Sequence, residues 1–293
     1  MIDSLTVRPF FHEDTGTWSY VVSQDRDAVV IDPVLDYDPA SGEITTHSAQ
    51  LLLQYMRENA LQVHRILETH AHADHLSSAA FLCDQVGAGI SIGAGIRDVQ
   101  AHFAKVFDYD SSSPALIDAF DQLLADGDIV EAGALRIEVI ALPGHTADCM
   151  GYRIGDNMFI GDSVFAPDIG TARCDFPGGS VEKLYDSIQR LYEMPEDTVL
   201  WLCHDYPPAG RERRARISVA ESKRDNRMLA EHTTRDTFYA ARRARDATLA
   251  APRLLYPSLQ VNIRGGRLPD AVSNGHRDLR TPISIKGCSD GLH

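Results

Sequence analysis

Short apolar stretches alternate with turn residues along much of the chain, and this pattern predicts strands. Single strands are expected at residues 5–11, 18–23, 28–31 and 63–68. Two longer stretches, residues 129–142 and 152–160, contain turn residues near their centres and predict hairpins. The chain should therefore contain extensive sheet, with both hairpins leading into polar loops.

Apolar residues at helical spacing predict helices at residues 49–59, 77–86 and 181–191. The charged stretch at residues 209–245 predicts further helix. Residues 107–128 are less regular, and we expect a short helix at residues 117–124 and a flap in this segment.

We expect one folded domain over residues 1–268. Residues 269–293 are rich in polar and turn-forming residues with little apolar periodicity, which predicts a loosely structured C-terminal tail.

Composition excludes several classes of function. With 28 basic and 42 acidic residues the formal net charge is -14, which argues against a nucleic-acid partner. No apolar stretch approaches the length of a membrane span, and the N-terminus lacks a signal-peptide pattern, so we expect a cytoplasmic protein without membrane contact. Its five cysteines are odd in number and lack CxxC spacing, so no disulfide framework is predicted, and packing is the favoured role of Cys83, Cys149 and Cys174.

The densest polar motif is THAHADH at residues 69–75, which contains His70, His72, Asp74 and His75. Imidazole nitrogen together with carboxylate oxygen suits zinc or non-heme iron better than calcium or magnesium. A polar loop that is merely rich in histidine is the alternative. The density of ligands favours a metal site.

Three further candidates each follow an apolar stretch, where a strand should end in a loop. They are His145 in LPGHT, Asp162 in IGDS and His204 in LCHDY. Taken singly, each residue could be an ordinary turn or surface residue. Their recurrence at strand ends predicts that they join the histidine motif. Together the seven residues suffice for two zinc ions bridged by Asp162, or for one metal with the remaining groups around it.

This ordered set of His-x-His-x-Asp-His, His, Asp and His resembles the metallo-β-lactamase superfamily. The resemblance implies an α/β fold, the αββα four-layer sandwich. It does not select a reaction, because the superfamily includes thioester hydrolases of the glyoxalase II type, lactonases, β-lactamases, nucleases, flavin-linked oxidoreductases and sulfur dioxygenases.

Three other stretches resemble the persulfide dioxygenases: GTARCDFPGG at residues 170–179, HDY at 204–206 and RDATLAAPRLLYPSLQVNIRGG at 245–266. That resemblance implies one Fe(II) held by His70, His145 and Asp162, with three positions open for substrate sulfur and dioxygen. It further implies oxidation of glutathione persulfide to sulfite and glutathione. The other four candidates would then orient ligands and solvent.

Two alternatives remain open. A glyoxalase II-like hydroxyacylglutathione hydrolase with two Zn(II) ions would use the same seven ligands. A non-catalytic binding protein on a degenerate fold is less well supported, because all seven ligands are present.

Four residues outside the ligand set are candidates for substrate recognition. Arg173 is expected near the site, either in an ion pair with Asp175 that shapes its loop or in support of Asp162 and the substrate pocket. Tyr206 should help to position the substrate. Lys223 and Arg227, four apart on an expected helical face, are candidate partners of glutathione carboxylates, although such charged runs are usually solvated. A homodimer is left open.

Overall fold

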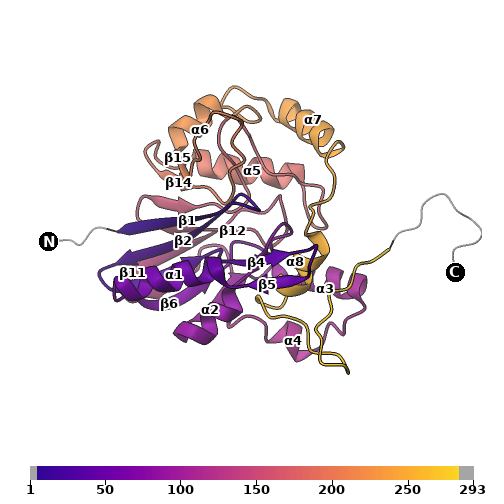
Figure 1. Ribbon diagram of the computed structural model, residues 1–293. Helices are drawn as coiled ribbons and strands as arrows, with labels where there is room; N and C mark the ends of the chain where they lie inside the picture. Colours follow the sequence, from indigo (N-terminus) through magenta and orange to yellow (C-terminus); the bar gives the residue numbers. More distant parts are fainter. Residues whose placement is uncertain (1–4, 284–293) are drawn as a thin grey trace, which may run out of the picture.

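Two six-stranded sheets form the centre of the computed structural model, which describes residues 5–283 (Figure 1). The first sheet has the order β1-β2-β3-β6-β8-β9. Its strands are β1 (Thr6–His12), β2 (Thr17–Gln24), β3 (Asp27–Ile31), β6 (Gln62–Leu67), β8 (Gly89–Gly93) and β9 (Gln122–Leu124). The first three pair antiparallel, as the predicted consecutive strands and turns suggested, and β3, β6, β8 and β9 pair parallel.

The second sheet follows the chain order from β10 to β15 and contains both predicted hairpins. Its strands are β10 (Ile129–Ala132), β11 (Leu135–Ala141), β12 (Met150–Ile154), β13 (Asn157–Phe159), β14 (Val199–Trp201) and β15 (Arg216–Ser218). All neighbours pair antiparallel except β13 and β14, which pair parallel. A small third sheet joins β5 (Glu43–Thr45), β4 (Val34–Asp38) and β7 (Leu76–Ser77).

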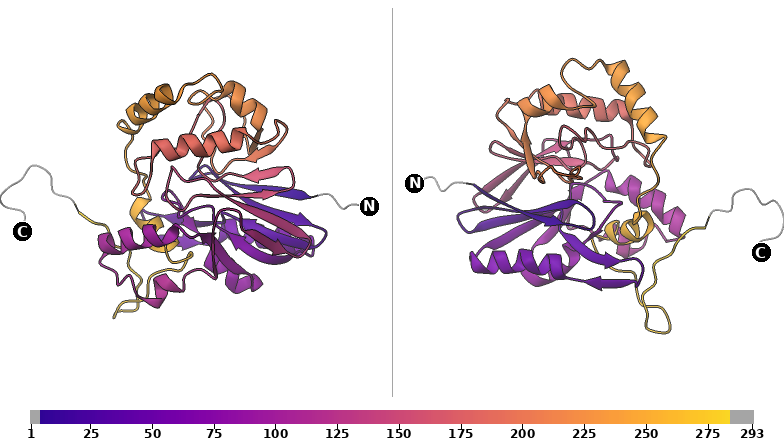
Figure 2. Two further views of the ribbon diagram at one scale, coloured as in Figure 1. Left: turned by 180° about the vertical axis from the view of Figure 1, so that it is seen from behind. Right: turned by 45° about the horizontal axis from the view of Figure 1, so that its top comes forward.

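Helices cover the outer faces of both large sheets (Figures 1 and 2). The first sheet packs against α1 (His47–Glu58), α2 (Ala79–Val86), α3 (Ile96–Phe107) and α8 (Leu255–Asn262). The second packs against α5 (Val181–Tyr192), α6 (Val219–Asp225) and α7 (Arg235–Asp246). Between the sheets lies a separate apolar core that includes Tyr20, Ile137 and Phe159. These layers confirm the predicted αββα sandwich.

The segment between α3 and β10 differs from its prediction. The short helix α4 (Pro114–Ile117) lies earlier than expected, and Gln122–Leu124 form β9 instead of helix. Leu116 and Phe120 are buried in the core of the first sheet, so the segment packs against the fold and does not form a flap. The sequence could not predict β9, because the pairing of this short strand with β8 leaves no local signal.

The charged stretch at residues 209–245 is only partly helical. The chain is helical in α6 and α7, but residues 226–234 between them are not. Asn226 ends α6: its side-chain oxygen accepts hydrogen bonds from the backbone of Met228 and Leu229, and its amide donates to the Gly170 carbonyl. Arg227 therefore lies beyond the helix, and the prediction that it shares a helical face with Lys223 is wrong.

Part of the predicted C-terminal tail lies against the fold. Residues 269–283 form no helix or strand, but the Arg280 backbone exchanges hydrogen bonds with the Gln260 side chain, and Leu279 packs near Val261. Residues 284–293 lie outside the described residues, so the tail beyond Ile283 stays a prediction.

No helix within residues 5–283 is both long enough and apolar enough to cross a membrane.

Candidate metal centre and adjoining cavity

Candidate ligands from four distant segments lie together at one end of the sheets. His70 follows β6, His145 follows β11, Asp162 follows β13 and His204 follows β14. Gly161 allows this convergence: its φ of +50° favours glycine, and a Cβ at that position would lie 2.8 Å from the Thr69 hydroxyl oxygen.

His70, His145 and Asp162 are one group of predicted ligands whose ligand atoms lie within 4.8 Å of one another. All three are at least nine-tenths buried. His145 Nε2 lies 3.6 Å from Asp162 Oδ2, whereas His70 Nε2 and Asp162 Oδ1 have no hydrogen-bond partner. Buried polar atoms without partners are costly and rare. A bound metal ion would satisfy them, so the residues fit the group that the sequence implies.

Hydrogen bonds fix the tautomers of both histidines. His145 Nδ1 lies 2.8 Å from the Arg173 carbonyl oxygen, which can only accept, so this nitrogen carries the proton. Thr69 Oγ1 donates to Asp32 Oδ2 at 2.9 Å, so His70 Nδ1, 3.0 Å away, must donate to Thr69. Both Nε2 atoms therefore keep a free lone pair for a metal.

The other four candidates adjoin this triad. Ligand atoms of His72, Asp74 and His75 lie within 4.8 Å of one another. His204 Nε2 lies 3.3 Å from Asp74 Oδ2 and 3.4 Å from Asp162 Oδ1. Asp162 thus faces His145 with one oxygen and His204 with the other, the arrangement that a bridging carboxylate needs. The geometry accommodates one metal at the triad or two metals sharing Asp162.

Burial and neighbouring charges shift the pKa values of the histidines in opposite directions. Burial and the surrounding imidazoles lower the pKa of His70 well below its usual value, and burial has the same effect on His75. Both rings are therefore neutral, the form that binds metals. Burial also opposes a charge on His72, but Asp32 Oδ1 at 3.1 Å and Glu68 Oε2 at 3.6 Å raise its pKa to about 9.

The peptide groups of the metal loop, which we define as residues 69–77, are held by three side chains from elsewhere. Asp32 Oδ1 accepts from Thr69 N at 2.7 Å and Asp148 Oδ2 from Ala71 N at 2.8 Å. Asn262 bonds to the loop at His72, His75 and Ser77. The sequence analysis missed all three. Asp32 follows an apolar strand and carried the signal that identified Asp162, whereas Asp148 and Asn262 have no comparable local signal.

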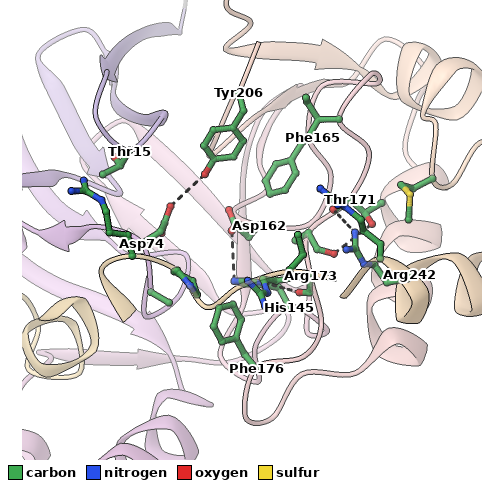
Figure 3. A pocket seen from close by; sticks show the side chains of 18 of the residues that line it. Thr15, Asp74, His145, Asp162, Phe165, Thr171, Arg173, Phe176, Tyr206 and Arg242 are labelled. Carbon is green, nitrogen blue, oxygen red and sulfur yellow. Dashed lines mark hydrogen bonds and ion pairs between the residues drawn. The ribbon is translucent and has the colours of Figure 1, made fainter. Parts of the chain in front are cut away.

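A cavity of about 760 Å³ opens beside the triad (Figure 3). His145, Asp162 and Asp74 form its metal-facing side, and Phe165, Phe176 and Tyr206 supply aromatic surface. Five arginines also line it: Arg173, Arg227, Arg242, Arg245 and Arg253.

These arginines differ in their partners. Arg173 forms a bidentate pair with Asp175 at 2.6 and 2.7 Å, which confirms the predicted ion pair, and Arg242 pairs with Asp246. Arg227 donates to the Asp168 carbonyl, and Arg245 lies 3.4 Å from the Thr248 hydroxyl. No ion pair within residues 5–283 engages Arg227, Arg245 or Arg253. Three cations are thus available to an anionic ligand.

Of the two remaining residues predicted to bind substrate, Tyr206 lines the cavity and Lys223 does not. The Tyr206 hydroxyl lies 3.5 Å from Asp74 Oδ2 (Figure 3). The Tyr206 ring stacks on that of His204. Lys223 does not line the cavity, and its ammonium group lies 3.9 Å from Glu196. Its glutathione-binding role therefore lacks structural support, because α6 directs the side chain elsewhere.

The four described cysteines are unpaired. Burial raises the pKa of Cys149 and Cys203 well above the usual value, that of Cys174 to about 12, and that of Cys83 as well. These thiols therefore stay protonated, as expected of groups that are not nucleophiles. Cys288 lies outside the described residues.

The chain has clear similarity to known proteins. The sequence pattern of the metallo-beta-lactamase superfamily matches residues 12–204. A probable metallo-hydrolase from Burkholderia pseudomallei is 44% identical over 95% of this chain and 99% of its own length. Glyoxylase B2 from Dictyostelium discoideum is 40% identical over 96% of this chain and 97% of its own length.

Similarity to persulfide dioxygenases is lower. The mitochondrial persulfide dioxygenase ETHE1 from Homo sapiens is 28% identical over 69% of each chain. The crystal structure of ETHE1 from Myxococcus xanthus matches with a TM-score of 0.71 and 28% identity, covering 89% of this chain and all of that one.

Proposed function

The chain belongs to the metallo-β-lactamase superfamily, and from this premise we propose that it is a non-heme iron dioxygenase that oxidises glutathione persulfide to sulfite and glutathione. The observation that carries the metal assignment is the triad of His70, His145 and Asp162. Its two free Nε2 atoms and one carboxylate converge in a buried site beside a cavity. Similarity to ETHE1 proteins supports the choice of reaction.

The triad defines the chemistry that the site could support. His70, His145 and Asp162 would hold a ferrous ion, and the adjoining cavity would leave room for a substrate and dioxygen. When bound, the ion supplies the redox chemistry by which dioxygen oxidises the outer sulfur of the persulfide. Water supplies the remaining oxygen of sulfite, and glutathione leaves with a proton as its thiol.

The cavity supports an anionic substrate. The chain has a net charge of -14, a field that opposes anions, yet five guanidinium groups line this one cavity. Arg227, Arg245 and Arg253 are the candidate partners for glutathione carboxylates, since a guanidinium group binds a carboxylate through paired hydrogen bonds. Phe165 and Phe176 would contact the apolar parts of the substrate and exclude water near the triad.

Residues around the triad would position ligands without binding iron in this proposal. His204 lies within 3.4 Å of Asp162 and can hold one of its oxygens by a hydrogen bond. Tyr206 and Asp74 face the cavity together, and the phenol hydroxyl, which donates a long hydrogen bond to Asp74 Oδ2, could exchange this partner for a bound substrate. We further propose a cytoplasmic location, and the homodimer stays a prediction.

A two-zinc hydroxyacylglutathione hydrolase is the second candidate. It is favoured by the position of Asp162 between His145 and His204, and by the 40% identity to glyoxylase B2. The anion-binding cavity suits both candidates, because both substrates are glutathione derivatives.

Metal content and oxygen uptake separate the two. Protein purified from iron-replete cells should contain close to one iron per chain, and glutathione persulfide should drive oxygen consumption with sulfite as product. His70→Ala, His145→Ala and Asp162→Ala should each lose most of the iron, whereas Lys223→Ala, away from the cavity, should retain it. Two zinc ions per chain, with thioester hydrolysis and no oxygen uptake, would exclude the dioxygenase. Zinc content alone would not, because zinc readily occupies such sites.

A further inference from the structure

Asn262, the last residue of α8, is buried and makes three hydrogen bonds to the metal loop. Its Nδ2 donates to the carbonyl oxygens of His72 and His75, each at 2.8 Å, and its Oδ1 accepts from Ser77 N, also at 2.8 Å. Only this orientation of the amide fits, because the reverse would place its oxygen against two carbonyl oxygens. One side chain therefore joins peptide groups on both sides of Asp74.

The loop depends on such partners because residues 69–75 form neither helix nor strand. Peptide groups buried in an irregular segment need hydrogen bonds from elsewhere. Asp32 and Asp148 hold Thr69 and Ala71 at the beginning of the loop. Among these three, Asn262 alone holds the loop from His72 onward, so each side chain has its own peptide groups to hold.

We infer that Asn262 is a positioning residue of the metal site, which sets the directions of the His72, Asp74 and His75 side chains by fixing the peptide groups from which they project. Side chains that orient a metal-binding group commonly change metal affinity by about 10–100-fold when they are removed. The inference rests on metal binding by the loop and not on the identity of the substrate.

Gln260 offers a matched control on the same helix. It is also a fully buried amide, and its Nε2 donates to two carbonyl oxygens, those of Tyr256 and Arg280, each at 2.8 Å. Its partners lie outside the metal loop. Asn262→Asp and Gln260→Glu therefore make the same chemical change at equal burial, and only the first affects the loop directly.

The experiment titrates each purified apoprotein with Zn²⁺ against a competing chelator and measures the unfolding midpoint of the metal-free chain in urea. Asn262→Asp should weaken zinc binding by about 10–100-fold. Gln260→Glu should leave zinc affinity near the wild-type value even where it lowers the unfolding midpoint as much. Asn262→Leu and Gln260→Met repeat the comparison without a buried carboxyl group.

Wild-type zinc affinity in folded Asn262→Asp or Asn262→Leu protein would overturn the inference. Equal losses of affinity in the Gln260 variants would do the same. Failure of both Asn262 variants to fold, with folded Gln260 variants, would show a purely structural role. A wild-type protein that binds metal but does not oxidise persulfide would refute the proposed reaction while leaving this inference intact.

Discussion

The hydroxyl of Thr69 should control metal affinity through the tautomer of His70. It donates to Asp32 Oδ2 at 2.9 Å and accepts from His70 Nδ1 at 3.0 Å. Thr69→Val keeps the shape and branching of this buried side chain but removes the acceptor. To bind metal through Nε2, His70 must then carry its proton on Nδ1 with no partner.

The cost follows from burial. An unsatisfied buried donor costs about 1–3 kcal/mol, which corresponds to a loss of about 5- to 150-fold in metal affinity. The metal-free chain avoids this particular cost, because its histidine can move the proton to Nε2, and it loses only the hydrogen bond that the hydroxyl donates to Asp32 Oδ2. Thr69→Ser keeps the hydroxyl and is the matched control.

Chelator competition measures the metal affinity, and urea unfolding of the metal-free variants measures their stability. We expect Thr69→Ser to bind metal nearly as tightly as the wild type and Thr69→Val to bind it much more weakly. A loss in Thr69→Ser as large as that in Thr69→Val would show that the methyl group contributes as much as the hydroxyl, and the tautomer would then not be the main determinant of affinity. Wild-type affinity in Thr69→Val would refute the tautomer argument.

Three further predictions follow from the site and its surroundings. Arg173→Gln removes a partly exposed bidentate ion pair and a hydrogen bond to the Ala250 carbonyl, so it should lower the free energy of unfolding by about 1–2 kcal/mol. It should also reduce activity while most iron is retained, because the backbone carbonyl of residue 173, which orients His145, is displaced. Calorimetry, metal analysis and kinetics test these effects, and wild-type activity would contradict the prediction. Tyr206→Phe removes one hydrogen-bonding group at the cavity. It should raise KM about 5-fold, the equivalent of about 1 kcal/mol, and leave the metal content unchanged. An unchanged KM would show that the hydroxyl does not contact the substrate. Burial opposes ionisation of Asp36, but hydrogen bonds with His12 and Ser48 outweigh burial and lower the pKa of Asp36 from 3.8 to about 2. The contribution of Asp36 to stability is therefore present above pH 3.8 and is lost as the pH falls through about 2. In urea unfolding at several acidic pH values, the Asp36→Asn variant should lose less stability over this range than the wild type.

The strand-end signal predicted that the candidate ligands lie together, because this signal is local. Each of His70, His145, Asp162 and His204 directly follows an apolar stretch, and the two sheets place all these ends together. The number of bound metals could not be predicted in this way, because the same seven ligands serve a mononuclear or a dinuclear site.

Other features depend on contacts between distant residues. Gln122–Leu124 form a strand because they pair with β8. Helix α6 ends where the Asn226 side chain bonds to the Gly170 carbonyl. The small sheet of β4, β5 and β7 includes strands too short to show a period. Asn262 reaches the metal loop from the far end of the chain, so no local pattern marks it.

That separation has a consequence for biosynthesis. Asn262 lies 190 residues after His72, with which it shares a hydrogen bond. At roughly 5–20 residues per second, a ribosome makes the metal loop about 10–40 s before it adds this last anchor. The ligand-rich segment thus leaves the ribosome well before its native geometry can form. We expect the native metal site to be completed only after nearly the whole chain has been translated, so that metal insertion is a late step in the maturation of this protein.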